Sequence, residues 1–156
     1  MSNAAPVVAI VGPTASGKSA LAMSIAQRLG AEVVNADAFC LYRGMDIGTA
    51  KPSLADRRMV VHHLIDTHDV EESVEVVGYR DQARAAIEAV RSRGRTPLLV
   101  GGSGLYVQAV LDDLRFPGTD PSVRQRLEGE LAQVGPEVLH GRLAAIDPAA
   151  AEAILP

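Results

Sequence analysis

Tryptophan is missing from this chain, aromatic residues account for 3% of it, and it holds a single cysteine. With so few aromatics, a hydrophobic core has to be built mainly from Val, Leu, Ile and Ala, which suits a parallel sheet that is buried on both faces. One cysteine excludes an internal disulfide framework, and Cys40 alone cannot form a structural zinc site. This usage fits a reducing compartment, and we expect the protein in the cytoplasm.

Long hydrophobic runs are missing as well. No apolar stretch approaches the roughly 20 residues that a membrane-spanning helix requires, and the N-terminus lacks the basic start of a secretory signal. We therefore expect no membrane association.

A surplus of basic residues is also absent, because the formal net charge is -4. A negative total disfavours nucleic-acid binding, since neutralising phosphates normally requires a basic surface. The chain does have enough length and apolar content to bury one core, with 156 residues of which 47% are hydrophobic. We expect a monomer, made of a single domain or part of one.

Short apolar runs alternate with segments of helical spacing along most of the chain. The runs at 7–11, 32–36 and 97–100 are typical of buried strands. Between them, one amphipathic segment ends at Gly30. A second helical face is formed by Tyr79, Ala83, Ala86, Ile87 and Val90. This alternation predicts an α/β fold with a parallel sheet flanked by helices.

Two further regions complete the expected organisation. Residues 41–58 are polar and contain glycine, and they are too long for a simple turn, so we expect a functional loop there. Two more helices are predicted at 121–133 and 136–145, the first with Asp120 as its N-cap.

The sequence GPTASGKS follows the first expected strand directly. In such a loop the backbone amides curl around phosphate oxygens, Lys18 neutralises charge, and the Ser19 hydroxyl can ligate Mg²⁺. The start of the following helix adds a favourable dipole. The pattern predicts a polyphosphate site formed by Gly12, Pro13, Thr14, Ala15, Ser16, Gly17, Lys18 and Ser19.

Two aspartates are candidates for the residue that holds the magnesium shell beside such a loop. Kinases, GTPases and motor ATPases use an aspartate at the end of an apolar strand, and the stretches ending in Asp37 and Asp66 both fit loosely. Asp37 lies where ligands bind in open α/β sheets, so it could accept a proton there, or it could cap a turn or helix. Ser103, in the glycine-rich corner 101–104, would face the same cleft, although a tight backbone corner also explains these glycines.

A cluster of possible metal ligands follows the predicted loop. Adjacent histidines on an extended segment point to opposite faces, and no distant His or Cys completes a tetrahedral set. We therefore expect histidines with a structural or substrate-gating role and no metal centre among His62, His63, Asp66, His68 and Asp69.

Several stretches together resemble one family, the tRNA dimethylallyltransferases, also called isopentenyltransferases. MDIGTAKP is the most specific piece, because P-loop kinases in general do not carry it. The resemblance covers nearly the whole chain in order. The matching stretches are GPTASGKS (12–19), NAD (35–37), LYRGMDIGTAKP (41–52), HHLID (62–66), PLLVGGSGLY (97–106) and, more weakly, DPSVR (120–124) and IDPAAAEAI (146–154).

The resemblance implies a P-loop NTPase-like catalytic core over residues 1–115, with a parallel sheet flanked by helices. It implies that residues 116–156 begin a helical tRNA-binding insertion. Members of the family usually continue well beyond this length, so we expect an N-terminal fragment in which the C-terminal remainder of the core is absent.

The resemblance also implies a reaction. A dimethylallyl group would pass from dimethylallyl diphosphate to the exocyclic N6 amine of the adenine next to the anticodon of tRNA, and diphosphate would be released. Asp37 matches the general base that takes the amine proton as the new bond forms. Lys18, the loop amides and Mg²⁺ at Ser19 would meet the charge on the leaving diphosphate. Ser103 completes the expected catalytic set.

The acceptor would be the anticodon stem-loop of a tRNA, and the family's tRNA contacts fall on Asp37, Ala38, Phe39, Cys40, Ser103 and Arg124. The family usually has Ser and commonly Gln at the positions where this chain has Ala38 and Cys40. Local basic residues could supply phosphate contacts despite the acidic total; these are Arg43, Lys51, Arg57 and Arg58.

Three alternatives remain open. The loop and sheet suit a small-molecule P-loop kinase equally well, although MDIGTAKP and HHLID disfavour it. A related adenylate isopentenyltransferase, which prenylates AMP or ATP, is separated from a tRNA enzyme only by the match at 120–124 and the segment after it. The third alternative is an inactive truncated fragment.

Overall fold

The computed structural model describes residues 5–112, 114 and 120–155. The chain divides into two compact units, Met1–Arg115 and Phe116–Pro156. The predicted boundary between 115 and 116 falls outside the described residues. None of the described helices is long and apolar enough to cross a membrane.

A four-stranded sheet forms the centre of the first unit. Its order is β1 (Val8–Val11), β4 (Pro97–Gly101), β2 (Glu32–Asn35) and β3 (His62–His63), and all neighbours are parallel. Every residue of β2 and β4 is buried, as expected for strands covered on both faces. The predicted parallel α/β fold is confirmed, and the segments after β1, β4 and β2 all leave the sheet at the same edge.

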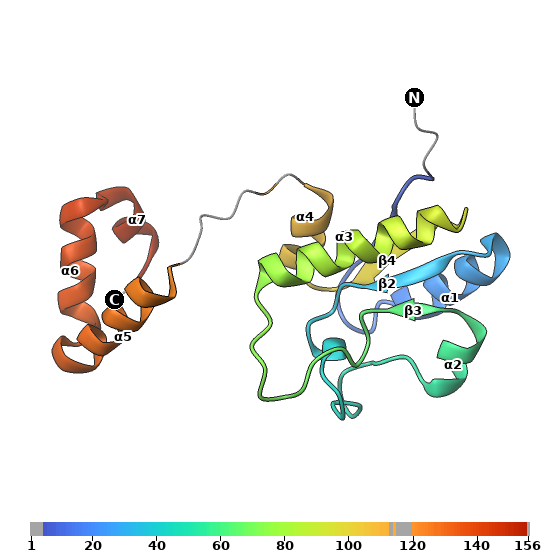
Figure 1. Cartoon of the computed structure of the whole chain (residues 1–156), viewed down its shortest axis with the longest axis horizontal. Helices are drawn as coiled ribbons and strands as arrows, with labels where there is room; N and C mark the ends of the chain where they lie inside the picture. Colours follow the sequence, from blue (N-terminus) through green and yellow to red (C-terminus); the bar gives the residue numbers. More distant parts are fainter. Residues whose placement is uncertain (1–4, 113, 115–119, 156) are drawn as a thin grey trace. The chain divides into compact units, whose positions relative to one another are not determined.

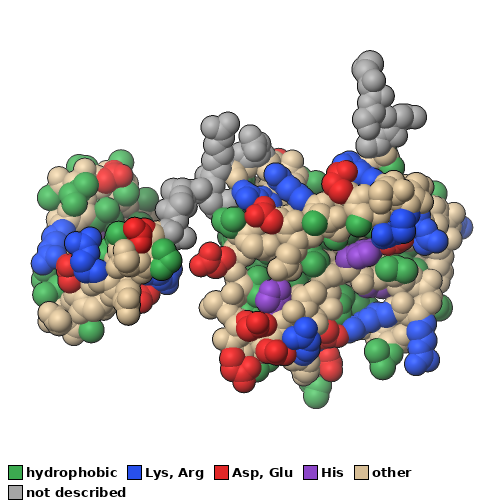
Figure 2. All heavy atoms as spheres, viewed as in Figure 1, with side chains coloured by type: hydrophobic (Ala, Val, Ile, Leu, Met, Phe, Trp, Pro, Cys, Tyr) green, Lys and Arg blue, Asp and Glu red, His purple; other side chains and the backbone are tan. Residues whose placement is uncertain are grey.

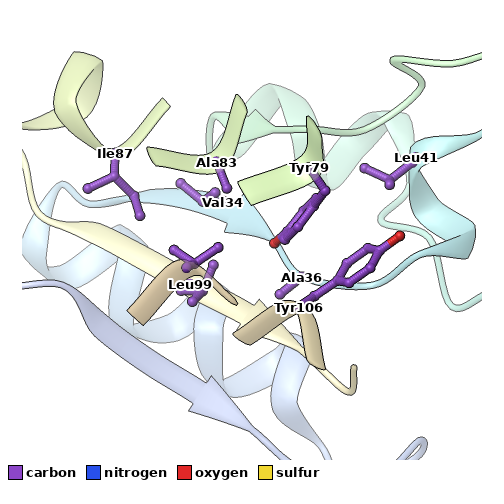
Figure 3. Close-up of a cluster of buried hydrophobic side chains, with 9 residues drawn as sticks. Val34, Ala36, Leu41, Tyr79, Ala83, Ile87, Leu99 and Tyr106 are labelled. Atoms are coloured by element: carbon purple, nitrogen blue, oxygen red, sulfur yellow. The ribbon is translucent and has the colours of Figure 1, made fainter. Parts of the chain in front are cut away.

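Helices cover both faces of this sheet (Figure 1). On one face, α1 (Lys18–Leu29) packs its alanines against Val33, Leu98 and Val100. On the other, α3 (Val76–Ser92) and α4 (Gly104–Leu111) pack against the alternate residues of the same strands, and the rings of Tyr79 and Tyr106 stack with centroids 4.1 Å apart (Figure 3). Successive strand residues point to opposite faces, so each strand contributes to both cores.

The helix ends follow the sequence signals. Gly30 ends α1 in a left-handed conformation with φ 61°, and its amide donates to Ala26 O. Gly94, at φ 70°, follows the end of α3. Both positions favour glycine because a Cβ atom is strained at positive φ.

The prediction of a loop over residues 41–58 is wrong in part. A short 3₁₀ helix, η1 (Phe39–Leu41), ends at the first residue of this segment, and the six-residue helix α2 (Leu54–Met59) covers its last part. Ser53 and Asp56 form a reciprocal capping box at its start, which stabilises a helix that is too short to show an apolar period.

The second unit consists of three helices, α5 (Pro121–Val134), α6 (Pro136–Ile146) and α7 (Pro148–Ala153). The two predicted helices are confirmed to within a residue at each end, and Asp120 caps α5 by accepting from the amides of Ser122 and Val123. The sequence analysis missed α7, which Asp147 caps through Ala150 N.

Candidate functional site

A cleft of about 680 Å³ opens at the carboxyl edge of the sheet. Its walls come from the phosphate loop and the start of α1, the ends of β2 and β4, η1, and residues 48–52. We call it the phosphate-loop cleft. The fold therefore brings the predicted loop and Asp37 to one cavity, because parallel strands release their following segments at the same edge.

The phosphate loop reaches this cleft through two residues with positive φ, Ala15 at 63° and Gly17 at 85°. Gly17 is the N-cap of α1 and provides no side chain to cap the first amides of the helix, so these amides point toward the loop. Lys18 Nζ donates to Pro13 O at 2.7 Å, which keeps the ammonium group at the loop. The arrangement is that of an anion-binding helix terminus.

The glycine-rich corner after β4 lies against both the phosphate loop and β2. A Cβ atom on Gly101 would be 2.0 Å from Ala36 O, so only glycine fits there. A Cβ atom on Gly102 would be 3.2 Å from Gly12 O and 3.9 Å from Lys18 Nζ. Gly101 lines the cleft, whereas Ser103, which was expected to face it, is not among the lining residues; its amide donates to Ala36 O at 3.4 Å.

Asp37 presents one free carboxylate oxygen at the cleft. Its Oδ1 accepts from Phe39 N at 3.0 Å, and Oδ2 has no partner in the part of the chain that the structure describes. Oδ1 therefore has the turn-capping role that the sequence allowed, and Oδ2 is the oxygen that could accept a proton. Asp37 lines the cleft together with Lys18 and Ser19.

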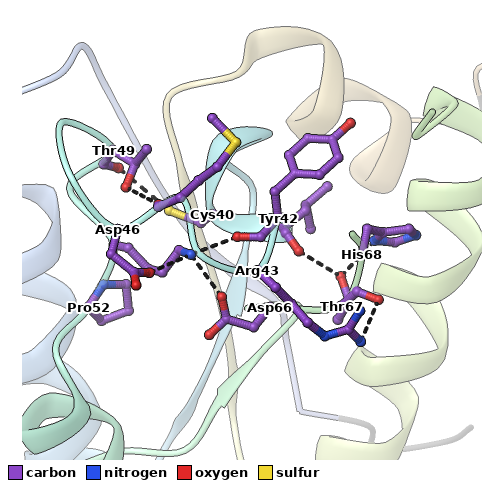
Figure 4. A network of polar contacts seen from close by, with 12 residues as sticks. Cys40, Tyr42, Arg43, Asp46, Thr49, Pro52, Asp66, Thr67 and His68 are labelled. Atoms are coloured by element: carbon purple, nitrogen blue, oxygen red, sulfur yellow. Dashed lines mark hydrogen bonds and ion pairs between the residues drawn. The ribbon is translucent and has the colours of Figure 1, made fainter. Parts of the chain in front are cut away.

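Asp66 is bound on both oxygens. Lys51 Nζ donates to Oδ1 at 2.8 Å, a contact that Figure 4 draws at Asp66. Arg57 Nη1 donates to Oδ2 at 2.6 Å. Burial alone would raise the pKa of Asp66, but the hydrogen bonds from Lys51 and Arg57 outweigh it and hold that pKa below its ordinary value. Asp66 is therefore unavailable to a magnesium ion, which leaves Asp37 as the stronger of the two candidates.

The basic residues expected to contact RNA phosphates are largely engaged within the protein. Lys51 is 2% exposed, and besides Asp66 its ammonium group donates to Tyr42 O and Asp46 Oδ1. The expectation of a phosphate contact by Lys51 is therefore wrong. Arg43 pairs with Asp69, and Arg57 pairs with Asp66. Figure 2 shows acidic and basic side chains interspersed over this face of the first unit.

The histidines have partners within the protein. His63 Nε2 lies 2.6 Å from Glu32 Oε2, and His62 Nδ1 lies 2.8 Å from Val60 O. No group of three or more metal-ligating side chains gathers among the described residues. His62 lines the phosphate-loop cleft, and burial lowers its pKa.

The family model described as IPP transferase matches residues 40–156. The chain belongs to this family. It is 59% identical over 154 residues to the tRNA dimethylallyltransferase of Parafrankia sp. (strain EAN1pec), covering 99% of this chain and 48% of that protein. The identity is 61% over 150 residues with the enzyme of the same name from Acidothermus cellulolyticus, covering 96% and 47%.

Solved structures of family members are also similar. The full-length tRNA isopentenylpyrophosphate transferase of Bacillus halodurans matches with a TM-score of 0.67 and 46% identity, over 96% of this chain and 50% of that one. A eukaryotic dimethylallyltransferase acting on tRNA matches with a TM-score of 0.79 and 28% identity, over 96% and 37%. The chain spans about half the length of the curated relatives it matches.

The residues expected to contact tRNA fall in two places. Ala38, Phe39 and Cys40 follow Asp37, where Phe39 is 59% exposed and Cys40 is buried with Sγ 3.6 Å from Thr49 O. Burial, with a smaller effect from the Asp37 charge, raises the pKa of the Cys40 thiol to about 11. Arg124 lies in the second unit on α5, where its Nε donates to Glu128 Oε1 at 2.8 Å.

Sequence reasoning missed the residues that brace the cleft. Asn35 holds the backbone of Asp37 with its side chain, and Lys51, Asp66 and Arg57 join three segments that are separate in the sequence. The motif pieces NAD and HHLID contain Asn35 and Asp66, but the letters alone do not show which side chains meet.

Proposed function

We propose that this chain transfers a dimethylallyl group from dimethylallyl diphosphate to the exocyclic N6 amine of the adenine next to the anticodon in tRNA, with release of diphosphate. The observation that carries the proposal is that a phosphate loop and a carboxylate with a free oxygen, Asp37, line one cleft. Similarity to proteins named tRNA dimethylallyltransferase selects this chemistry among those that such a loop serves.

The donor's diphosphate would bind at residues 12–19. The backbone amides at the start of α1 would donate to its oxygens, and Lys18 would offset their charge by turning from Pro13 O. These groups would stabilise the negative charge that develops as the carbon–oxygen bond of the donor breaks.

The loop fits a magnesium ion bound through few protein ligands. Ser19 lines the cleft, and its hydroxyl has no partner in the part of the chain that the structure describes. Mg²⁺ usually keeps several waters and binds through one or two protein oxygens plus substrate phosphates, so a single hydroxyl suits it. When bound, the ion would add positive charge at the leaving diphosphate.

Asp37 would accept the proton of the acceptor amine. The lone pair of an adenine amine is delocalised into the ring, so removing a proton as the carbon–nitrogen bond forms lowers the barrier. Oδ2 is the acceptor atom, because Phe39 N occupies Oδ1. The adenine has to leave its stack to reach this oxygen, which costs little in a single-stranded anticodon loop.

The remaining assignments follow from the same proposal. Residues 1–115 form the catalytic core and 116–156 contribute to tRNA binding, with Arg124 among the RNA contacts and Ser103 beside the cleft. We also propose that the enzyme acts in the cytoplasm and as a monomer.

The proposal is tested by incubating the chain with dimethylallyl diphosphate, Mg²⁺ and an unmodified anticodon stem-loop, followed by mass spectrometry of the RNA. The expected result is the mass gain of one prenyl unit on the adenine, and dimethylallyl diphosphate should raise the Tm of the protein. Protection by ATP alone, with no change in the RNA, would support a kinase and contradict the proposal.

A further inference from the structure

Asn35 is a buried polar residue, with 6% of its surface exposed. Removing an amide from water is costly unless its groups find hydrogen-bond partners. Asn35 uses its side chain for three such bonds. The pattern of these bonds shows what the buried amide holds in place.

Both polar main-chain groups of Asp37 are bound by the Asn35 side chain. Asn35 Oδ1 accepts from Asp37 N at 3.1 Å, and Asn35 Nδ2 donates to Asp37 O at 2.8 Å. The same Nδ2 donates to Leu64 O at 3.0 Å, which ties Asp37 to the segment after β3. We call these three side-chain bonds of Asn35 the clamp. The main chain of Asn35 is held as well, because the hydroxyl of Tyr79 in α3 donates to Asn35 O at 2.9 Å.

The clamp acts where the sheet no longer fixes the backbone. The last bond between this chain segment and β4 runs from Ala36 N to Val100 O, one residue before Asp37. Beyond it, the Asn35 amide replaces the sheet ladder for Asp37, while Phe39 N fixes Oδ1. The direction of the free oxygen Oδ2 therefore depends on the backbone that Asn35 holds.

We propose that Asn35 is the positioning residue for Asp37, holding its backbone so that Oδ2 faces the acceptor amine in the phosphate-loop cleft. This inference rests on the proposed function of Asp37 as the base. Asn35 lines the same cleft, but none of its hydrogen bonds reaches the phosphate loop, so we expect its loss to change donor affinity little. A displacement of about 1 Å can cost roughly a hundredfold in rate.

The test compares Asn35→Ala, Asn35→Asp and a matched control, Glu32→Gln. Glu32 is also buried and lies at the opposite end of the same strand, where it pairs with Arg93 and His63. For each variant we would measure Tm, the affinity for dimethylallyl diphosphate, the single-turnover rate of prenyl transfer to a stem-loop, and hydrogen exchange of the Asp37 amide by NMR.

The expected result is a rate about thirtyfold to a hundredfold lower in Asn35→Ala than in Glu32→Gln, with donor affinity within threefold of the wild type. The Asp37 amide should exchange faster in Asn35→Ala and stay protected in Asn35→Asp, which keeps the acceptor atom but loses both donor bonds and slows transfer. Equal rates in Asn35→Ala and Glu32→Gln would overturn the proposal.

The two proposals can fail separately. If the wild-type chain binds the donor but transfers nothing, the proposed function fails for this chain. Hydrogen exchange then tests the clamp by itself. The proposal that Asn35 holds the Asp37 backbone is overturned if the Asp37 amide exchanges as slowly in Asn35→Ala as in the wild type.

Discussion

Asp37 and Asp66 follow neighbouring parallel strands, β2 and β3, at the same edge of the sheet, yet their surroundings differ. Asp66 has a cation on each oxygen, whereas Asp37 has a backbone amide on one oxygen and no partner on the other among the described residues. The same residue type at equivalent positions thus supports the architecture in one case and is free for chemistry in the other.

The network around Asp66 explains what that carboxylate does. Through Lys51 it holds the segment that carries residues 48–52 of the cleft wall, and through Arg57 it holds α2. Its own amide donates to Cys40 O, three residues after Asp37. Asp66 therefore shapes the cleft without contributing a free oxygen to it.

The largest effect on stability is expected from Gly101→Ala, because Gly101 lies against Ala36, the residue before Asp37. The new Cβ atom would lie 2.0 Å from Ala36 O, so the residue that leads into Asp37 has to move. We expect a loss of about 3 kcal/mol in the free energy of unfolding, measured by urea denaturation. Gly104→Ala is the matched control, because nothing lies within 4 Å of its Cβ position and alanine favours the helix; an equal loss there would contradict this explanation.

A smaller loss is expected from Asp66→Asn. This substitution leaves the buried ammonium group of Lys51 with one carboxylate, that of the exposed Asp46. Because Asp66 is itself 31% exposed, we expect about 2 kcal/mol, less than for a fully buried pair. Asp69→Asn, which removes an exposed pair with Arg43, should cost clearly less than Asp66→Asn, and similar losses in the two variants would show that burial of the network is unimportant.

The Asp66 pairs should also give a measurable dependence on pH. Since the folded-state pKa of Asp66 is lowered, its contribution is present above the unfolded pKa of about 4 and is lost as pH falls through the folded value. The difference in stability between wild type and Asp66→Asn should therefore shrink below about pH 4. Denaturant unfolding of both proteins from about pH 7 to about pH 3 measures it, and a constant difference would refute the assignment.

The smallest effect of Asp66→Asn is expected at Cys40, whose thiol is influenced by the charges of both Asp37 and Asp66. Burial raises its pKa to about 11, so iodoacetamide at about pH 8 should alkylate it more than about a hundredfold slower than a free cysteine. In Asp66→Asn the rate should rise severalfold, because Thr49, which accepts from the thiol, lies in the segment that Lys51 holds. Mass spectrometry follows this single thiol directly, and an unchanged rate would show that the segment does not depend on Asp66.

The sequence predicted the parts of the fold that have a local period. The three apolar strands, α1 and α3 show the spacing that a buried face requires, and the glycine-rich loop is a contiguous motif. Helices α5 and α6 were predicted from their start signals, a proline at the first turn of each and Asp120 before α5. The short helices α2 and α7 have too few residues to show such a period, and their caps at Ser53 and Asp147 are the remaining local signals.

The braces of the site could not be predicted in the same way. Lys51 and Asp66 are 15 residues apart and meet only because β3 returns beside β2. The Asn35 clamp depends on a bond to Leu64, 29 residues away. The sequence favoured Asp37 over Asp66 by its position and by the family resemblance. It could not show that Asp66 is bound on both oxygens, since the two cations come from other segments.

The most direct test of this account is the single-turnover rate of prenyl transfer to an anticodon stem-loop in Asp37→Asn and Asp66→Asn, at saturating dimethylallyl diphosphate. We predict that Asp37→Asn loses about a thousandfold with little change in Tm or donor affinity, because it removes the proton acceptor. Asp66→Asn should stay within about tenfold of the wild type once its lower stability is allowed for. A rate retained in Asp37→Asn and lost in Asp66→Asn would contradict the account.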